Sequence, residues 1–191
     1  MPDPIPLEPG NIYHIYNRGN NRENLFIEER NYPYFMNLWF KHIDPIAVTY
    51  AHCLLRNHFH SLVSIREADQ IPEKFRASLS RPFSNLFNAY ARTINLTYHR
   101  SGALFKRPFG RVKIINDAQL MQIIVYIHRN PQKHGFVTDF RQWPYSSYSA
   151  YISMQPGQSD QNWILELFGG RTRFIEFHQR NGEDLLMEDD S

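Results

Sequence analysis

The sequence is poor in cysteine, because Cys53 is the only one among 191 residues. A single cysteine excludes an intramolecular disulfide framework and a cysteine-based zinc cluster. The chain also lacks an apolar run of transmembrane length. Its start, MPDPIPLEPG, is acidic and rich in proline, where a secretory signal needs a basic start followed by an apolar run. These absences predict a cytoplasmic protein without a membrane partner.

Acidic side chains are nearly absent from the middle of the chain. Between Lys74 and Thr138 only Asp117 is acidic, against eleven lysines and arginines. From Asp160 to the end the balance reverses, with eight acids against three arginines, so the formal net charge of +2 hides the cationic middle. Solubility alone does not need such a block, and most of its cations are arginines interspersed with aromatic residues. The pattern predicts nucleic-acid binding through phosphate contacts and base stacking.

The predicted elements follow the order β-α-β-β-α-β, with a further helix at the end. Alternating β-branched and aromatic residues predict strands, and apolar residues at helical spacing predict helices. The expected strands are 11–19, two segments of 45–65 that divide at Arg56-Asn57, and 103–115; the expected helices are 28–43, 72–99 with an interruption near Pro82, and 117–130, capped by Asn116 and ended by Pro131. This order indicates an α+β, ferredoxin-like fold with a split antiparallel sheet. Beyond residue 140 we expect an aromatic loop, WPYSSYSAY, and one or two short helices within 162–180.

Two histidines stand one residue apart in the expected strand HFHSLVSI. Alternate side chains of a strand project to the same face, so His58 and His60 share a face with Leu62, while Phe59 points to the other. This spacing permits a metal site. Packed or surface histidines show the same spacing, however, so the pair needs a third ligand and a chemical task.

The segment LMQIIVYIHRN offers candidates for the third metal ligand and for a catalytic side chain. Tyr126 and Asn130 are four residues apart and share one helical face, whereas His128 and Arg129 point elsewhere. An asparagine oxygen suits magnesium or manganese, and two imidazoles favour manganese or another transition ion over calcium. A tyrosine beside such an ion could attack a phosphodiester, provided that nearby positive charge favours the phenolate. Helical spacing alone favours a core aromatic at Tyr126 over a catalytic tyrosine.

Four stretches carry a resemblance to a known family: YHIYNRGNNRENLF, NHFHSLV, SGALFKRPFGRVKI, and LMQIIVYIHRNPQKHGFV with the following WPYSSYSAY. Their order and spacing over residues 11–151 resemble the REP-associated tyrosine transposases, a single-tyrosine branch of the HUH endonuclease superfamily. The resemblance implies metal-binding histidines at His58 and His60, a catalytic tyrosine at Tyr126 and a third metal ligand at Asn130. We accordingly expect a leader over 1–10, a catalytic domain over 11–151, and a C-terminal extension with an acidic tail over 152–191.

The activity implied by this resemblance is that of a metal-dependent single-stranded DNA endonuclease and strand-transferase acting on hairpin DNA. Tyr126 would form a 5′-phosphotyrosine and release a 3′-hydroxyl, with Mg²⁺ or Mn²⁺ as the cofactor. A second 3′-hydroxyl could reverse this step and rejoin strands without ATP. A monomer is favoured, and a homodimer with composite active sites is the alternative.

Polar residues near the first strand and in the basic strand are predicted to contact DNA. They are Asn17, Arg18, Asn20, Arg107, Arg111 and Lys113. The first three are also expected at the protein surface. Histidines outside the HFH segment, among them His14, His128 and His178, are assigned no role.

Two other functions remain open. A ferredoxin-like sheet with aromatic residues and arginines also fits a non-catalytic single-stranded nucleic-acid-binding module. A metal-dependent hydrolase could instead use water as the nucleophile, with Tyr126 in a structural role. A covalent adduct between protein and DNA distinguishes the transposase-like enzyme from both.

Overall fold

The computed structural model describes residues 5–153 and 162–180. Most of the acids predicted to form the C-terminal tail, and the first part of the predicted leader, fall outside the described residues. The chain forms two compact units. The first unit contains Met1–Thr49 and Leu54–Ile114, and the second contains Tyr50–Cys53 and Ile115–Ser191. The domain boundaries predicted at residues 10 and 151 stay predictions.

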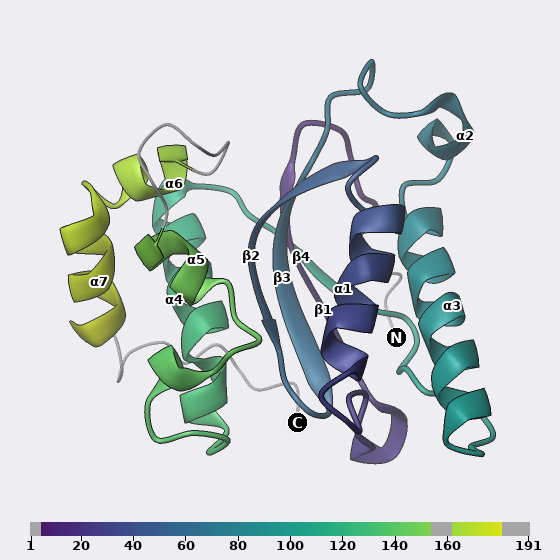
Figure 1. Ribbon diagram of the computed structural model, residues 1–191. Coiled ribbons are helices and arrows are strands. Elements are labelled where there is room, and N and C mark those ends of the chain that lie inside the picture. The colour runs from purple at the N-terminus through teal and green to yellow at the C-terminus, as the bar shows by residue number, and fades with distance from the viewer. Residues whose placement is uncertain (1–4, 154–161, 181–191) are drawn as a thin grey trace. The chain divides into compact units, whose positions relative to one another are not determined.

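A four-stranded antiparallel sheet forms the centre of the first unit (Figure 1). Strand β1 (Ile12–Arg18) pairs antiparallel with β3 (His58–Ile65) on one side and with β4 (Gly110–Lys113) on the other. Strand β2 (Ala47–Leu54) lies outside β3 and completes the order β2-β3-β1-β4. Because β3 separates β1 from β2, this order confirms the predicted ferredoxin-like arrangement.

Helices α1 (Asn31–His42) and α3 (Arg81–Thr97) lie side by side on one face of this sheet (Figure 1). Their contact with the sheet is aromatic. The ring centroid of Phe59 in β3 lies 5.2 Å from that of Phe35 in α1 and 5.9 Å from that of Phe87 in α3. Rings of this kind bury large apolar areas, which makes them the main stabilising contacts between helices and sheet.

The fourth strand is shorter than predicted. Residues 103–109 do not join β4, and only one bridge, Gly19 with Phe105, links them to the segment after β1. They run along α3 instead, where the ring centroids of Phe105 and Phe109 lie 4.9 and 5.5 Å from that of Phe87. Burial of these two rings against the helix replaces strand pairing, which the alternation pattern alone does not indicate.

The other elements of the first unit follow the prediction more closely. The helical stretch expected over 72–99 is interrupted, with α2 (Glu73–Arg76) separated from α3 by residues 77–80. A short 3₁₀ helix, η1 (Asn20–Arg22), follows β1. Helix α1 begins at Asn31, whose side-chain oxygen accepts hydrogen bonds from the backbone N–H groups of Ile27 and Glu28. Pro33 therefore falls in the first turn of α1, where a missing N–H costs nothing.

Helix α4 (Asp117–Lys133) begins the second unit. Asn116 caps it as predicted, because its side-chain oxygen accepts a 2.8 Å hydrogen bond from the backbone N–H of Gln119. The prediction that Pro131 ends the helix is wrong, since the helix continues through Pro131 to Lys133. Proline is tolerated there because it lies in the last turn, and the His134 N–H still bonds to the carbonyl of Asn130 at 2.9 Å.

Shorter helices complete the second unit, and α7 runs beside α4 (Figure 1). They are η2 (Phe140–Gln142), α5 (Tyr148–Ser153), α6 (Asn162–Leu167) and α7 (Arg171–Arg180). The prediction of one or two short helices within 162–180 is confirmed by α6 and α7, whereas the predicted aromatic loop is helical in its last part. The Tyr151 hydroxyl donates a 2.6 Å hydrogen bond to the Tyr50 carbonyl, which ties α5 to the middle of β2.

Cys53 is buried in this part of β2, and its burial raises the pKa of its thiol. A thiol of this kind is a poor nucleophile, which agrees with a structural role. None of the helices in the described residues is long and apolar enough to cross a membrane.

Candidate active site

The two histidines of β3 face away from the helices of the first unit. Phe59 packs against α1 and α3, so strand alternation sends His58 and His60 to the opposite face of the sheet. Their ring centroids lie 5.2 Å apart at an interplanar angle of 87°. The predicted pair is therefore brought together on one face.

Hydrogen bonds hold both imidazoles through Nδ1. The Nδ1 of His58 lies 2.7 Å from the side-chain oxygen of Asn57, which can only accept, so this nitrogen carries the proton. The Nδ1 of His60 lies 3.0 Å from Nε2 of His14. When His60 donates in this contact, both β3 histidines carry their lone pair on Nε2. This is how outer-shell partners orient metal-binding histidines in proteins.

His14 is a functional candidate that the sequence prediction missed. It is 4% exposed, and its ring stacks on that of His60 with centroids 5.1 Å apart. In β1 it lies opposite Leu62 of β3, on the same face as the β3 pair. The alternation of β1 places it on one of the two faces, but only the register between β1 and β3 brings it to His60.

Tyr16 lies on the same face, and its ring centroid is 5.9 Å from that of His60. Its position depends on Gly110, its partner in β4. A Cβ atom at Gly110 would lie 2.2 Å from the Tyr16 ring, so any side chain there would displace the tyrosine. A glycine is therefore needed at position 110, because the Tyr16 ring lies close to the β4 backbone there.

Tyr126 and Asn130 lie on α4 in the second unit, one helical turn apart as predicted. Tyr126 is 8% exposed and Asn130 is fully buried. The Asn130 side-chain N–H donates a 3.0 Å hydrogen bond to the Tyr126 carbonyl, which fixes the orientation of the amide. Lys133 brings a cation to the tyrosine, because its Nζ lies 5.3 Å from the Tyr126 ring centroid.

The Asn130 side-chain oxygen is buried and has no hydrogen-bond partner among the described residues. A buried oxygen without a partner costs about 1–3 kcal/mol, so such an atom usually serves a bound group. Two imidazole nitrogens and an amide oxygen suit manganese or magnesium, so these residues fit the predicted metal. Within the described part of the chain no three His, Cys, Asp or Glu side chains gather to hold a metal. The structure brings His58 and His60 together in one unit and Tyr126 and Asn130 together in the other.

Of the strand residues predicted to bind DNA, Arg18 lies opposite His58 and shares the face of the histidine pair, whereas Asn17, Arg111 and Lys113 lie on the other face. In the strand register Arg111 is opposite Ile15, and Lys113 is opposite Tyr13, on the face that the helices cover. The Lys113 ammonium pairs with Glu8 at 2.8 Å, which raises the pKa of the lysine. The prediction that Asn17 lies at the surface is wrong, since it is 5% exposed. It alternates with Ile15 toward the helices, whereas Arg18 and Asn20 are partly exposed as expected.

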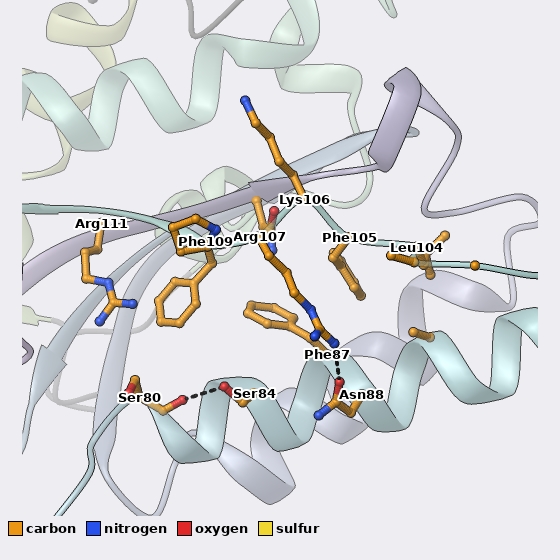
Figure 2. Close-up of a pocket in the computed structure, with 15 residues that line it drawn as sticks. Ser80, Ser84, Phe87, Asn88, Leu104, Phe105, Lys106, Arg107, Phe109 and Arg111 are labelled. Carbon is orange, nitrogen blue, oxygen red and sulfur yellow. Dashed lines mark hydrogen bonds between the residues drawn. The ribbon is translucent and has the colours of Figure 1, made fainter. Parts of the chain in front are cut away.

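An open pocket of about 440 Å³ lies between α3 and residues 102–111 (Figure 2). Arg107 reaches across it and donates a 3.1 Å hydrogen bond to the Asn88 side chain of α3. The Arg111 guanidinium lies over the Phe109 ring, 4.0 Å from its centroid, and partial burial lowers the pKa of this arginine. Asn17 also lines the pocket. Three of the predicted DNA-binding residues therefore meet at one place.

A second histidine cluster, missed by the sequence prediction, lies in the interior of the second unit. His128 of α4 and His178 of α7 are fully buried, with 2.8 Å between Nδ1 of His128 and Nε2 of His178. The His178 Nδ1 must donate to the Phe174 carbonyl, 2.8 Å away, so His178 accepts from His128. His128 then accepts from the Ser147 hydroxyl at 2.8 Å. Both imidazoles are neutral in this network, and desolvation lowers the pKa of each, to about 4 for His178.

The fold defined by this sheet recurs in a solved structure. That structure is described as "Structure of the REP associates tyrosine transposase bound to a REP hairpin", and it matches 85% of this chain and 91% of its own with a TM-score of 0.66. The identity is 19%, so the match establishes a shared α+β fold.

A sequence relative carries the same family name. It is a protein of Haemophilus influenzae described as "Putative REP-associated tyrosine transposase", 32% identical over 102 residues. The match covers 52% of this chain and 58% of the relative's length. No family model matches the chain. The resemblance predicted from the sequence is confirmed by this relative and by the solved structure.

Proposed function

We propose that this protein is a transposase-like enzyme that nicks and rejoins single-stranded DNA next to a hairpin, in the cytoplasm. The observation that carries the proposal is the β3 histidine pair, in which both rings are held through Nδ1 as metal-binding imidazoles are. The chain spans about 58% of the H. influenzae relative, and that relative's name supports the same class of reaction. The hairpin DNA in the solved structure of similar fold supports the choice of substrate.

In the proposed reaction the Tyr126 hydroxyl oxygen attacks a scissile phosphorus. A bond forms between this oxygen and phosphorus while the bond from phosphorus to the 3′-oxygen breaks. The phenolic proton leaves the tyrosine, and the departing 3′-oxygen takes up a proton, so the products are a 5′-phosphotyrosine and a 3′-hydroxyl. The phosphotyrosine keeps a phosphodiester bond, and attack by a 3′-hydroxyl rejoins DNA without an energy source.

The chain supplies positioning and charge for this step. His58, His60 and Asn130 would hold a divalent ion, which when bound polarises the scissile phosphate as a Lewis acid. Asn57 and His14 orient the two imidazoles, and the bond from Asn130 to the Tyr126 carbonyl keeps the amide oxygen available. The Lys133 ammonium lies 5.3 Å from the Tyr126 ring centroid and places a positive charge beside the proposed nucleophile. Both halves must act on one phosphodiester, within a monomer or across a homodimer.

The decisive experiment detects a covalent adduct. Labelled hairpin DNA with single-stranded flanks is incubated with the protein and manganese, and denaturing gels separate the adduct. We expect an adduct from the wild type and none from Tyr126→Phe. Tyr16→Phe is the matched variant, because Tyr16 is the tyrosine next to His60. An adduct lost in Tyr16→Phe but kept in Tyr126→Phe would assign the nucleophile to Tyr16 and refute this part of the proposal.

A second candidate function is non-catalytic binding of single-stranded nucleic acid. It is favoured by the row of rings formed by His14, Tyr16 and His60 on one sheet face, with centroids 5.1 to 5.9 Å apart. Tyr16, the partly exposed ring of this row, could stack a base. Binding of hairpin DNA without any adduct or cleavage, in manganese or magnesium, would select this function over the enzyme.

A further inference from the structure

The pocket between α3 and residues 102–111 combines aromatic walls with positive charge (Figure 2). Phe87 of α3, together with Phe105 and Phe109 of the opposite wall, lines its apolar part. Arg107 and Arg111 supply cations, and no carboxylate lies among the residues that line the pocket. A ligand for this pocket therefore needs a flat apolar portion and a negative group.

One of the two arginines is incompletely satisfied. The Nε of Arg111 is buried and has no hydrogen-bond acceptor among the described residues. Its guanidinium carbon lies 4.0 Å from the Phe109 ring centroid, and this cation–π contact holds the guanidinium in place before any ligand arrives. Arg107 is held by Asn88 from the opposite wall, as Figure 2 shows. Preorganised guanidinium groups suit a phosphate, which can accept from several donors at once.

The volume of the pocket indicates what size of anionic ligand fits it. Its volume of about 440 Å³ exceeds what an inorganic phosphate needs and falls within the range of small-molecule sites, roughly 300–1,000 Å³. The hydroxyls of Ser80 and Ser84 and the Asn88 amide add polar groups along the α3 wall. A nucleotide unites an aromatic base, polar edges and a phosphate, and so matches all three properties of the pocket.

We propose that this pocket binds a single unpaired nucleotide of the DNA substrate. Its base packs against the three phenylalanines, and its phosphate lies beside Arg107 and Arg111. The inference rests on the proposed function, because it assumes a single-stranded DNA substrate. The pocket lies on the sheet face opposite the β3 histidines, so it is a separate subsite that selects DNA by an unpaired residue. The edge strand β4 has only four residues, so a flexible single strand of DNA can pass around this edge from one face of the sheet to the other.

A pocket-filling variant tests the proposal. Ser84 is exposed on α3 and lines the pocket, whereas its neighbour Asn85 is exposed and does not. Ser84→Trp should fill the pocket without disturbing the core, and Asn85→Trp is the matched control. The probe is a fluorescent hairpin with a four-nucleotide single-stranded tail on either side. We expect Ser84→Trp to weaken binding about tenfold or more, as stacking of one base would, and Asn85→Trp to leave it within twofold.

An abasic scan of the tails makes the test specific. Each tail nucleotide is replaced in turn by an abasic residue, and one such position should weaken wild-type binding about tenfold. The same abasic DNA should bind Ser84→Trp no more weakly than intact DNA does, because the two changes remove one interaction. Additive losses, or equal binding by the Ser84→Trp and Asn85→Trp variants, would overturn the pocket proposal.

Charge is tested separately with Arg107→Gln against Arg92→Gln, an exposed arginine of α3 outside the pocket. We expect Arg107→Gln to weaken binding more than Arg92→Gln does. Equal losses from the two variants would count against a phosphate contact at Arg107. If the wild type forms the adduct but Ser84→Trp binds DNA as well as Asn85→Trp does, the pocket proposal is refuted and the proposed function is kept. A wild type that binds no hairpin DNA refutes both the proposed function and the pocket.

Discussion

Removal of His178 should make the stability of the second unit less dependent on pH. In the folded chain His178 is buried and donates to the Phe174 carbonyl, and desolvation lowers its pKa from 6.5 to about 4. Between these two pKa values the unfolded chain binds more protons than the folded chain. The contribution of His178 is therefore fully present above pH 6.5 and is lost as the pH falls toward 4.

The size of this effect follows from the same two pKa values. One pKa unit corresponds to about 1.4 kcal/mol, so the full loss from this histidine approaches ~3 kcal/mol, of which about 2 kcal/mol falls between pH 7 and pH 5. In His178→Phe this titration is absent. The variant also leaves the His128 N–H without its acceptor, which should lower stability at pH 7 by about 1–3 kcal/mol.

Urea denaturation at pH 7 and pH 5 measures both effects. The wild type should lose about 2 kcal/mol more than His178→Phe when the pH is lowered. Ser147→Ala is the control, because it removes a hydrogen bond to His128 but no titratable group. The control should be destabilised at both pH values and keep most of the wild-type pH dependence. A His178→Phe variant with the full wild-type pH dependence would refute the neutral-histidine network.

Three further predictions concern the proposed active site. Asn130→Ala should change the free energy of unfolding by less than about 1 kcal/mol, because loss of its hydrogen bond to the Tyr126 carbonyl is offset by removal of an unpaired buried oxygen, yet abolish manganese binding in calorimetry. Gly110→Ala should displace the Tyr16 ring, which its Cβ would meet at 2.2 Å, and lower stability by about 1–3 kcal/mol in thermal melts. Chelation of divalent ions by EDTA should eliminate the DNA adduct while gel-shift binding of the hairpin persists; adduct formation that survives chelation would exclude the metal from the reaction.

Local sequence patterns were sufficient for the order of the elements and for one feature of each half of the candidate site. Period-two alternation puts His58 and His60 on one face of a strand, and the helical period puts Tyr126 and Asn130 one turn apart. These relations hold within a single element, so they need no knowledge of the remaining chain. The interruption before α3 and the Asn116 cap were predictable for the same reason.

Relations between distant residues depended on the tertiary structure. His14 meets His60 across 46 positions of sequence, and His128 meets His178 across 50. Neither contact has a local periodic signal, because the register of two strands and the packing of two helices decide it. The burial of Asn17 and the path of residues 103–109 along α3 likewise follow from packing.

The sequence by itself therefore determined which side chains share a face of each strand or helix, since backbone geometry alone sets that. Only the tertiary structure decided which of those faces meet. It brought His14 within hydrogen-bond distance of His60 and left the Asn130 oxygen buried without a partner among the described residues. It also placed Arg107 and Arg111 around an aromatic pocket. The physical reason is that burial and hydrogen-bond satisfaction depend on all surrounding segments, and these come from far along the chain.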